Sequence, residues 1–112
     1  MITYEDFDKV DIRLGKIIKV EDFPEAKKPA FKLTIDFGSE IGIKRSSVQL
    51  VGSYAREELM NMLVACVVNF PIKKIASFES EVLTLGFKNN SDQGYILVSP
   101  TKNMVNLGDK LC

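Results

Sequence analysis

The sequence has 112 residues, and its 15 Lys and Arg residues balance 15 Asp and Glu residues, so the formal net charge at pH 7 is zero. This length is typical of one domain with a single core, and we expect one domain over residues 1–112. The balanced charge excludes a strongly basic fold that wraps nucleic acid. Any binding to nucleic acid must therefore depend on a local patch of basic residues.

The residue types that the chain lacks exclude several kinds of catalytic and metal site. The chain contains no His, so His-based zinc sites, Ser-His-Asp triads and Cys-His pairs cannot form within it. Cys66 lies in an apolar run and is expected in the core, and with Cys112 it does not indicate a disulfide framework. The first residues lack the pattern of a signal peptide, and no apolar run is long enough to cross a bilayer. We expect a cytoplasmic protein without membrane insertion.

The first part of the chain predicts a short helix followed by a long strand. Thr3 and Asp6 have the spacing of a helix capping box, and we expect a helical turn over residues 4–9. From Asp11 onward, apolar side chains occupy much of both faces of an extended segment. Gly15 lies within this segment and would permit the coil or bulge that a small barrel needs.

The next segment carries the clearest alternation in the chain. After a connection with two prolines, residues 31–37 place an apolar side chain at every second position. A turn follows, and residues 41–50 form a third predicted strand. The period then changes to that of a helix, with Ser53 in the position of an N-cap. We expect one short helix over roughly residues 53–62.

The second half of the chain predicts further strands around a basic connection. Residues 64–68 are a continuous apolar run rich in β-branched side chains, which predicts a fourth strand. Pro71 cannot donate to a sheet, so this strand should end near Asn69 and lead into a surface segment. We expect another strand to begin near Glu81 and a short one over residues 95–98, with a turn between them.

The order of these elements predicts a mainly β protein with an OB-fold. Three strands, one short helix and then two or more strands are the arrangement of this five-stranded Greek-key barrel. The helix would lie between strands 3 and 4, and short extensions would precede and follow the barrel. SH3-like barrels also use short strands, and they are the alternative that the pattern leaves open.

Six motifs follow one another along nearly the whole chain. They are DIRLGKI at 11–17, FPEA at 23–26, KLTIDFG at 32–38, IKRSSVQ at 43–49, NFPIKKI at 69–75 and SEV at 80–82. Together they resemble the CsaA family, export-associated and chaperone-like proteins that are built on the tRNA-binding OB domain. The resemblance implies a homodimer that binds unfolded or pre-export polypeptides, on a scaffold whose relatives bind tRNA.

The segment after the fourth strand differs from the tRNA-binding relatives, in which it tends to read Asn-Leu-Lys-Pro-Arg-Lys. Here Phe70 and Pro71 come before the basic pair, which makes the segment more apolar. Asn69, Ser80 and Glu81 match polar positions of the tRNA-binding domains, and the resemblance implies contacts with a nucleotide or a backbone amide. The alternative is that Asn69 ends the strand and Ser80 forms a local backbone cap.

Apolar side chains near this segment are candidates for a peptide-binding pocket beside the mouth of the barrel. They are Phe23, Phe70, Pro71, Ile75 and Phe78. Neighbouring aromatic and aliphatic groups of this kind accept an extended peptide. The alternative is that Phe70 and Phe78 close the end of the barrel as part of the core.

Four basic residues would give this pocket a positively charged rim if the third strand lies beside the connection. Lys44 and Arg45 come from the strand, and Lys73 and Lys74 come from the connection. Such a patch would contact phosphates or the acidic parts of a bound chain. The alternative is that these side chains only face solvent, as most runs of charge do.

Three functions are compared on this basis. The first is a chaperone-like protein that holds unfolded or precursor polypeptides and, lacking a P-loop, uses no nucleotide, metal or other cofactor. The second is a module that binds tRNA or structured RNA. An enzyme that uses carboxylates such as Glu79 and Glu81 is disfavoured, because no base or set of metal ligands lies near them in the sequence.

A homodimer is the expected assembly, and apolar residues near both ends of the chain are candidates for its interface. These are Ile2, Phe7, Met104, Val105 and Leu107.

Overall fold

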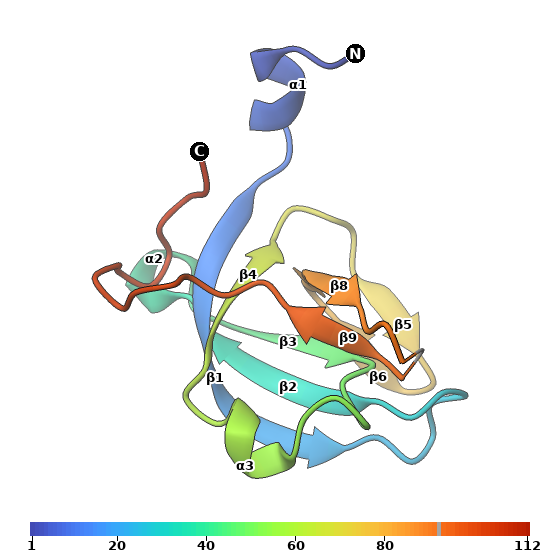
Figure 1. Cartoon of the computed structure of the whole chain (residues 1–112). Helices are drawn as coiled ribbons and strands as arrows, with labels where there is room; N and C mark the ends of the chain where they lie inside the picture. The colour runs from blue at the N-terminus through green and yellow to red at the C-terminus, as the bar shows by residue number, and fades with distance from the viewer. Residues whose placement is uncertain (92) are drawn as a thin grey trace.

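The computed structural model describes residues 1–91 and 93–112. The helices are α1 (Tyr4–Asp8), α2 (Gly38–Ile41) and α3 (Arg56–Leu59). The strands are β1 (Ile12–Asp22), β2 (Phe31–Asp36), β3 (Ile43–Val48), β4 (Leu63–Val67), β5 (Lys73–Ile75), β6 (Phe78–Ser80), β7 (Leu83–Thr84), β8 (Gly86–Lys88) and β9 (Tyr95–Leu97). Figure 1 shows that α1 projects from one end of the barrel and that α3 lies at the opposite end.

Five strands form the barrel. They are hydrogen-bonded in the order β3-β2-β1-β4-β7, and each neighbouring pair is antiparallel. The two edges of this sheet, β3 and β7, meet where the backbone N–H groups of Glu81 and Val82 donate to the carbonyl oxygen of Arg45. This nearly closed five-stranded barrel, with α3 between the third and fourth strands, confirms the predicted OB-fold.

The main core lies inside the barrel and follows the alternation of the strands. In β2, Phe31, Leu33 and Ile35 are buried, and the side chains between them are partly exposed. Phe37 continues the pattern and is fully buried. The alternation predicted for residues 31–37 is therefore confirmed, because successive side chains of a strand point to opposite faces.

A β-bulge interrupts the pairing of β1 with β2, but it does not lie at Gly15, the residue expected to permit a coil or bulge. The register with β2 shifts between Ile17 and Lys19, further along the strand than Gly15. Gly15 is instead packed beneath β2, where an added Cβ would overlap Ile35 and lie 2.8 Å from Cε1 of Phe37. The bulge is therefore not at Gly15, and the missing side chain at this position allows Ile35 and Phe37 to pack closely against the backbone of β1.

The helix between the third and fourth strands is shorter than the sequence predicted, and its cap is different. The N-cap of α3 is Ala55, whose N–H donates to Oε1 of Glu58 at 2.8 Å. Ser53 is not the cap, because its Oγ donates to the carbonyl oxygen of Gln93 at 2.6 Å. The hydroxyl therefore makes a tertiary contact in place of the predicted local one.

Two short hairpins lie outside the barrel, formed by β5 with β6 and by β8 with β9. The β5–β6 hairpin lies within the segment that the sequence predicted only as a surface connection. Ala76 and Ser77 form its two-residue turn, and Ala76 has a φ of 53°. Such turns favour Gly or Asn at positions of positive φ, so Ala76 offered no sequence signal for a hairpin.

The N-terminal helix forms as predicted. Thr3 Oγ1 accepts a hydrogen bond from the N–H of Asp6 at 3.2 Å, and Asp6 Oδ2 accepts one from the N–H of Thr3 at 3.0 Å. These reciprocal bonds confirm the capping box. Among the described residues, no helix has the length and apolar character that a bilayer crossing requires.

Gly15→Ala is expected to lower the free energy of unfolding by about 2 kcal/mol, which is within the range for overpacking of a core. The cause is the overlap of the new methyl group with Ile35 and Phe37. Urea unfolding followed by circular dichroism measures the change. A stability equal to that of the wild type would contradict the close approach of β1 and β2 at this position.

Candidate functional site

An aromatic pair outside the barrel holds the β5–β6 hairpin in place. Phe23 and Phe78 are 3% and 4% exposed, and their ring centroids are 5.4 Å apart with an interplanar angle of 59°. Together with Ala30 they form a second buried cluster, against which Ile75 and Ala26 pack. The structure thus brings together Phe23, Ile75 and Phe78 from the predicted apolar pocket.

The other two residues of that predicted pocket lie elsewhere. Phe70 and Pro71 are on the connection between β4 and β5, and both are exposed, Phe70 to 54%. Neither belongs to the cluster around Phe23 and Phe78. Phe70 therefore does not close the end of the barrel, and its ring is available to solvent or to a partner.

Basic side chains cover the aromatic pair. Lys32 Nζ lies 4.9 Å from the ring centroid of Phe23 and 5.6 Å from that of Phe78, and the guanidinium carbon of Arg45 lies 4.3 Å from the Phe78 centroid. These distances suit cation–π attraction, which is worth about 0.5–1 kcal/mol at exposed sites. Arg45 was predicted for the site and Lys32 was not, although the alternation of residues 31–37 places Lys32 on the outer face.

Lys44 does not join Arg45 over the rings. It precedes Arg45 in β3, is half-buried and is paired with Ile35 of β2. Since neighbouring side chains of a strand point to opposite faces, the side chains of Lys44 and Arg45 lie on opposite faces of β3.

A groove of about 1000 Å³ runs between the β5–β6 hairpin and the barrel. Lys73, Lys74 and Ile75 of β5 line one side, and Lys27 and Lys28 of the β1–β2 connection also line it. Residues of β3, β7, β8 and β9 complete it. We call this feature the lysine groove.

Apolar surface and positive charge meet in the lysine groove. Val48, Leu83 and Tyr95 are among its apolar lining residues. Glu25 is the acidic residue of the lining, and its carboxylate lies 3.8 Å from Nζ of Lys32. Lys27 and Lys28 were missed in the sequence, where their position between two prolines was the available signal.

Ser80 and Glu81 close the barrel. Ser80 Oγ accepts a hydrogen bond from the N–H of Ser47 at 3.1 Å. Glu81 Oε1 accepts one from the N–H of Arg45 at 3.1 Å, and the N–H of Glu81 donates to the carbonyl oxygen of Arg45 at 2.8 Å. Both residues were candidates for RNA contacts. Their polar atoms are hydrogen-bonded to β3, along the seam where the edge strands β3 and β7 meet.

Buried hydroxyl groups continue this seam into the core. Thr84 Oγ1 donates to Ser46 Oγ at 2.9 Å, and Ser46 Oγ donates to the carbonyl oxygen of Val82 at 3.0 Å. The thiol of Cys66 donates to Thr84 Oγ1 at 3.6 Å. Burial raises the pKa of Cys66 to about 12, although the hydrogen bond to Thr84 opposes this shift. The thiol therefore stays protonated near neutral pH and is a poor nucleophile.

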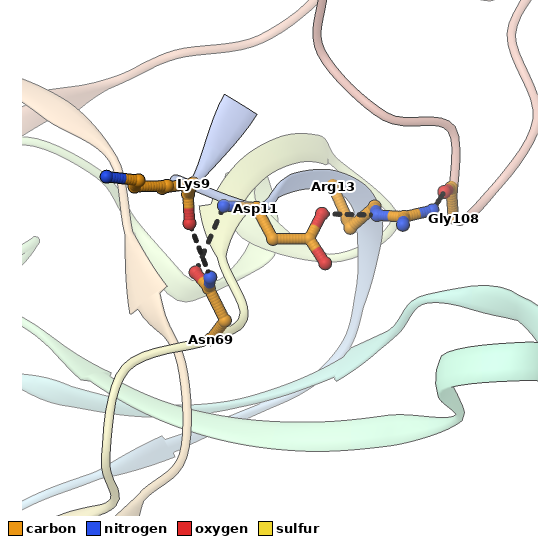
Figure 2. Close-up of polar contacts among 5 residues, drawn as sticks. All are labelled: Lys9, Asp11, Arg13, Asn69 and Gly108. Atoms are coloured by element: carbon orange, nitrogen blue, oxygen red, sulfur yellow. Dashed lines mark hydrogen bonds and ion pairs between the residues drawn. The ribbon is translucent and has the colours of Figure 1, made fainter. Parts of the chain in front are cut away.

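Asn69 fastens the N-terminal extension to the end of β4 (Figure 2). Its Oδ1 accepts from the N–H of Asp11 at 3.0 Å, and its Nδ2 donates to the carbonyl oxygen of Lys9 at 2.7 Å. In the same region, Arg13 Nε lies 2.6 Å from Asp11 Oδ1, and Arg13 Nη1 donates to the carbonyl oxygen of Gly108. Asn69 thus links β4 to the N-terminal extension, while Arg13 links β1 to the C-terminal segment.

No group of three or more Cys, Asp or Glu side chains in residues 1–91 and 93–112 is arranged to hold a metal ion. The lysine groove combines four lysines with the exposed apolar side chains of Leu83 and Tyr95.

The sequence matches the model of the family described as "Putative tRNA binding domain" over residues 12–110. Methionine–tRNA ligase of Pyrococcus furiosus is 36% identical over 112 residues, which are 98% of this chain and 14% of the ligase. Methionine–tRNA ligase of Methanococcus vannielii is 32% identical, with 99% of this chain and 16% of the ligase aligned. The chain thus spans only a small fraction of the length of these curated relatives.

Two crystal structures match from end to end. The CsaA chaperone protein from Picrophilus torridus has 50% sequence identity and a TM-score of 0.90, with 100% of both chains covered. The chaperone CsaA from Bacillus anthracis has 40% identity and a TM-score of 0.90, with 100% of this chain and 99% of that chain covered. With the tRNA-binding domain match and the OB-fold, these similarities show that the chain belongs to the CsaA family, built on the tRNA-binding domain.

Proposed function

We propose that this protein is a chaperone-like binder of unfolded or pre-export polypeptides and that the lysine groove is its binding site. The observation that carries the proposal is the combination, in one groove of about 1000 Å³, of apolar side chains with the lysines of β5 and of the β1–β2 connection. An unfolded chain offers both exposed apolar side chains and charged groups, so it can use both kinds of surface.

Phe70 and Pro71 extend the proposed apolar contact beyond the groove. Phe70 precedes Lys73 by three residues, and a chain of that length spans about 10 Å at most. Its exposed ring therefore lies near the lysine groove, although it is not part of the lining. Exposed aromatic side chains are enriched where proteins bind partners.

Binding of tRNA or structured RNA is the second candidate function. The observations that favour it are the cations stacked on Phe23 and Phe78 and the lysines of the groove. Phosphate contacts of this kind give an affinity that falls steeply with salt, whereas burial of apolar groups depends weakly on salt. Salt dependence therefore separates the two functions.

We infer that the protein binds without catalysis and without a cofactor. Glu81, one of the carboxylates considered for catalysis, is engaged with the backbone of Arg45. The Cys66 thiol is protonated and buried. Two free cysteines support the inference of a reducing compartment, the cytoplasm.

A homodimer is the proposed assembly, with the two terminal segments as its interface. The C-terminal segment lies beside the start of β1, where the N–H of Leu111 donates to the carbonyl oxygen of Ile12 at 2.9 Å. Ile2, Tyr4 and Met104 are strongly exposed. Apolar side chains in such number are typical of a surface that a partner covers.

The first prediction concerns the lysines of β5. Lys73→Ala/Lys74→Ala is expected to weaken tRNA binding about tenfold at low salt and to reduce the salt slope by about 2, because each lysine that contacts a phosphate contributes about one unit. Binding of an unfolded polypeptide of near-zero net charge should change less than about threefold and should survive high salt. Fluorescence anisotropy with labelled ligands measures both.

Lys19→Ala/Lys102→Ala removes the same charge from exposed residues outside the groove and is the matched control. It should leave both ligands bound as in the wild type. If only tRNA binds the wild type, the polypeptide function is contradicted and the protein is an RNA-binding module. If neither ligand binds, both functions are contradicted.

The second prediction compares two phenylalanines. Phe70→Ala should keep the fold and weaken polypeptide binding severalfold, because its ring is exposed on the connection that leads into β5. Phe78→Ala should lower the free energy of unfolding by about 3 kcal/mol, because it empties the second cluster. Circular dichroism during urea unfolding gives the stabilities, and anisotropy gives the affinities. Loss of the folded signal in Phe70→Ala would remove Phe70 from the proposed site.

The third prediction concerns assembly. Met104→Asp is expected to convert the dimer to a monomer, because a buried unpaired carboxylate strongly destabilises an apolar interface. Size-exclusion chromatography with light scattering measures the mass. Met60→Asp is the control, since Met60 is also exposed but follows α3 at the opposite end of the barrel (Figure 1). A monomeric wild type would contradict the assembly.

A further inference from the structure

One edge of the β5–β6 hairpin borders the lysine groove. In the described part of the chain, β5 is paired with β6 alone. β6 lies against the barrel, where Ser80 Oγ accepts a hydrogen bond from the N–H of Ser47 in β3. Lys73, Lys74 and Ile75 line the groove. Among the described residues, none of β6 (Phe78–Ser80) lines the groove, so the groove lies on the side of β5 that faces away from β6.

The register of the hairpin determines which backbone groups this edge presents. Ile75 pairs with Phe78 across the two-residue turn, and the next pair is Lys74 with Glu79. The pair that closes a two-residue hairpin exchanges hydrogen bonds, and the following pair does not, because the two kinds of pair alternate in antiparallel sheets. The N–H and C=O groups of Lys74 thus point away from β6, toward the groove.

The positive charge of the groove favours a bound segment with acidic side chains. Lys27, Lys28, Lys73 and Lys74 contribute positive charge, and Glu25, the one acidic lining residue among those described, is already paired with Lys32. Acidic side chains of a bound segment would find these four lysines along the groove. Aliphatic side chains that alternate with them would lie on the opposite face of the segment, as successive side chains of a strand do.

We propose that an extended polypeptide segment with alternating acidic and aliphatic side chains binds in the lysine groove as a third strand on β5, with its backbone paired to Lys74. This inference rests on the proposed function and specifies its mode of binding. Strand addition takes its affinity from backbone hydrogen bonds and its specificity from alternate side chains. The two lysines of β5 would repel a basic strand. The three-residue length of β5 limits unspecific pairing at this edge.

Lys74→Pro tests the backbone contact, and Lys74→Ala is its control. Both variants remove the charge, but only proline removes the N–H group. Proline is tolerated on an edge strand when its position faces away from the ladder, so the hairpin should persist, and circular dichroism checks the fold. For a labelled decapeptide of alternating Glu and Val, we expect Lys74→Pro to bind about tenfold more weakly than Lys74→Ala. Equal affinities of the two folded variants would overturn the inference.

Backbone-methylated peptides give a second measurement that uses only the wild-type protein. One decapeptide is N-methylated at its Glu residues and the other at its Val residues, so each blocks one edge of the strand. We expect one pattern to weaken binding about tenfold more than the other, because only one edge faces β5. Equal effects of the two patterns would overturn the inference.

The outcomes separate this inference from the proposed function. If the unmethylated decapeptide binds but the two methylation patterns and the two Lys74 variants behave alike, strand addition is wrong and polypeptide binding stands. If the decapeptide and unfolded polypeptides fail to bind while a single-stranded oligonucleotide binds, both the proposed function and this inference are overturned.

Discussion

Closure of the barrel between β3 and β7 is the constraint on which the rest of the structure depends. A curved sheet of five strands leaves two edges, and unpaired backbone groups at buried edges are costly. Arg45 and Glu81 exchange hydrogen bonds across this gap, and Ser80 accepts from the N–H of Ser47. Beneath them, the hydroxyl group of Thr84 donates to that of Ser46, which donates to the carbonyl oxygen of Val82. Side chains therefore complete the closure that a regular strand ladder does not provide.

This closure also shapes the proposed site. The chain leaves β4, forms the β5–β6 hairpin outside the barrel and returns at Ser80 and Glu81 to the seam. Phe78 fixes the hairpin by packing on Phe23, and Arg45 joins the seam to the ring of Phe78. The lysine groove is the space left between this anchored hairpin and the barrel. The position of the groove thus follows from two contacts, the apolar packing of Phe78 on Phe23 and the hydrogen bonds between Glu81 and Arg45.

The same domain occurs in different settings. It matches CsaA chaperone structures over their whole length, and it matches about 14% of the length of methionine–tRNA ligases. A shared fold does not decide function, which depends on the chemistry of the site. The proposed binding of polypeptides rests on two local features of this chain, the exposed Phe70 and Pro71 and the lysines that line the groove.

Local patterns in the sequence predicted the capping box at Thr3 and the alternation of residues 31–37, because each depends on residues that are close along the chain. The order of the predicted elements indicated an OB-fold but left an SH3-like barrel open, and the pairing of strands that are far apart in the sequence established the OB-fold. The sequence also placed Phe23, Phe78 and Arg45 among the candidate site residues. Tertiary contacts show that Ser80 and Glu81 close the seam between β3 and β7, that Asn69 holds the N-terminal extension, and that Lys27 and Lys28 line a groove with β5. The physical reason is that the role of a polar side chain depends on the groups that face it. Those groups come from segments far away in the sequence.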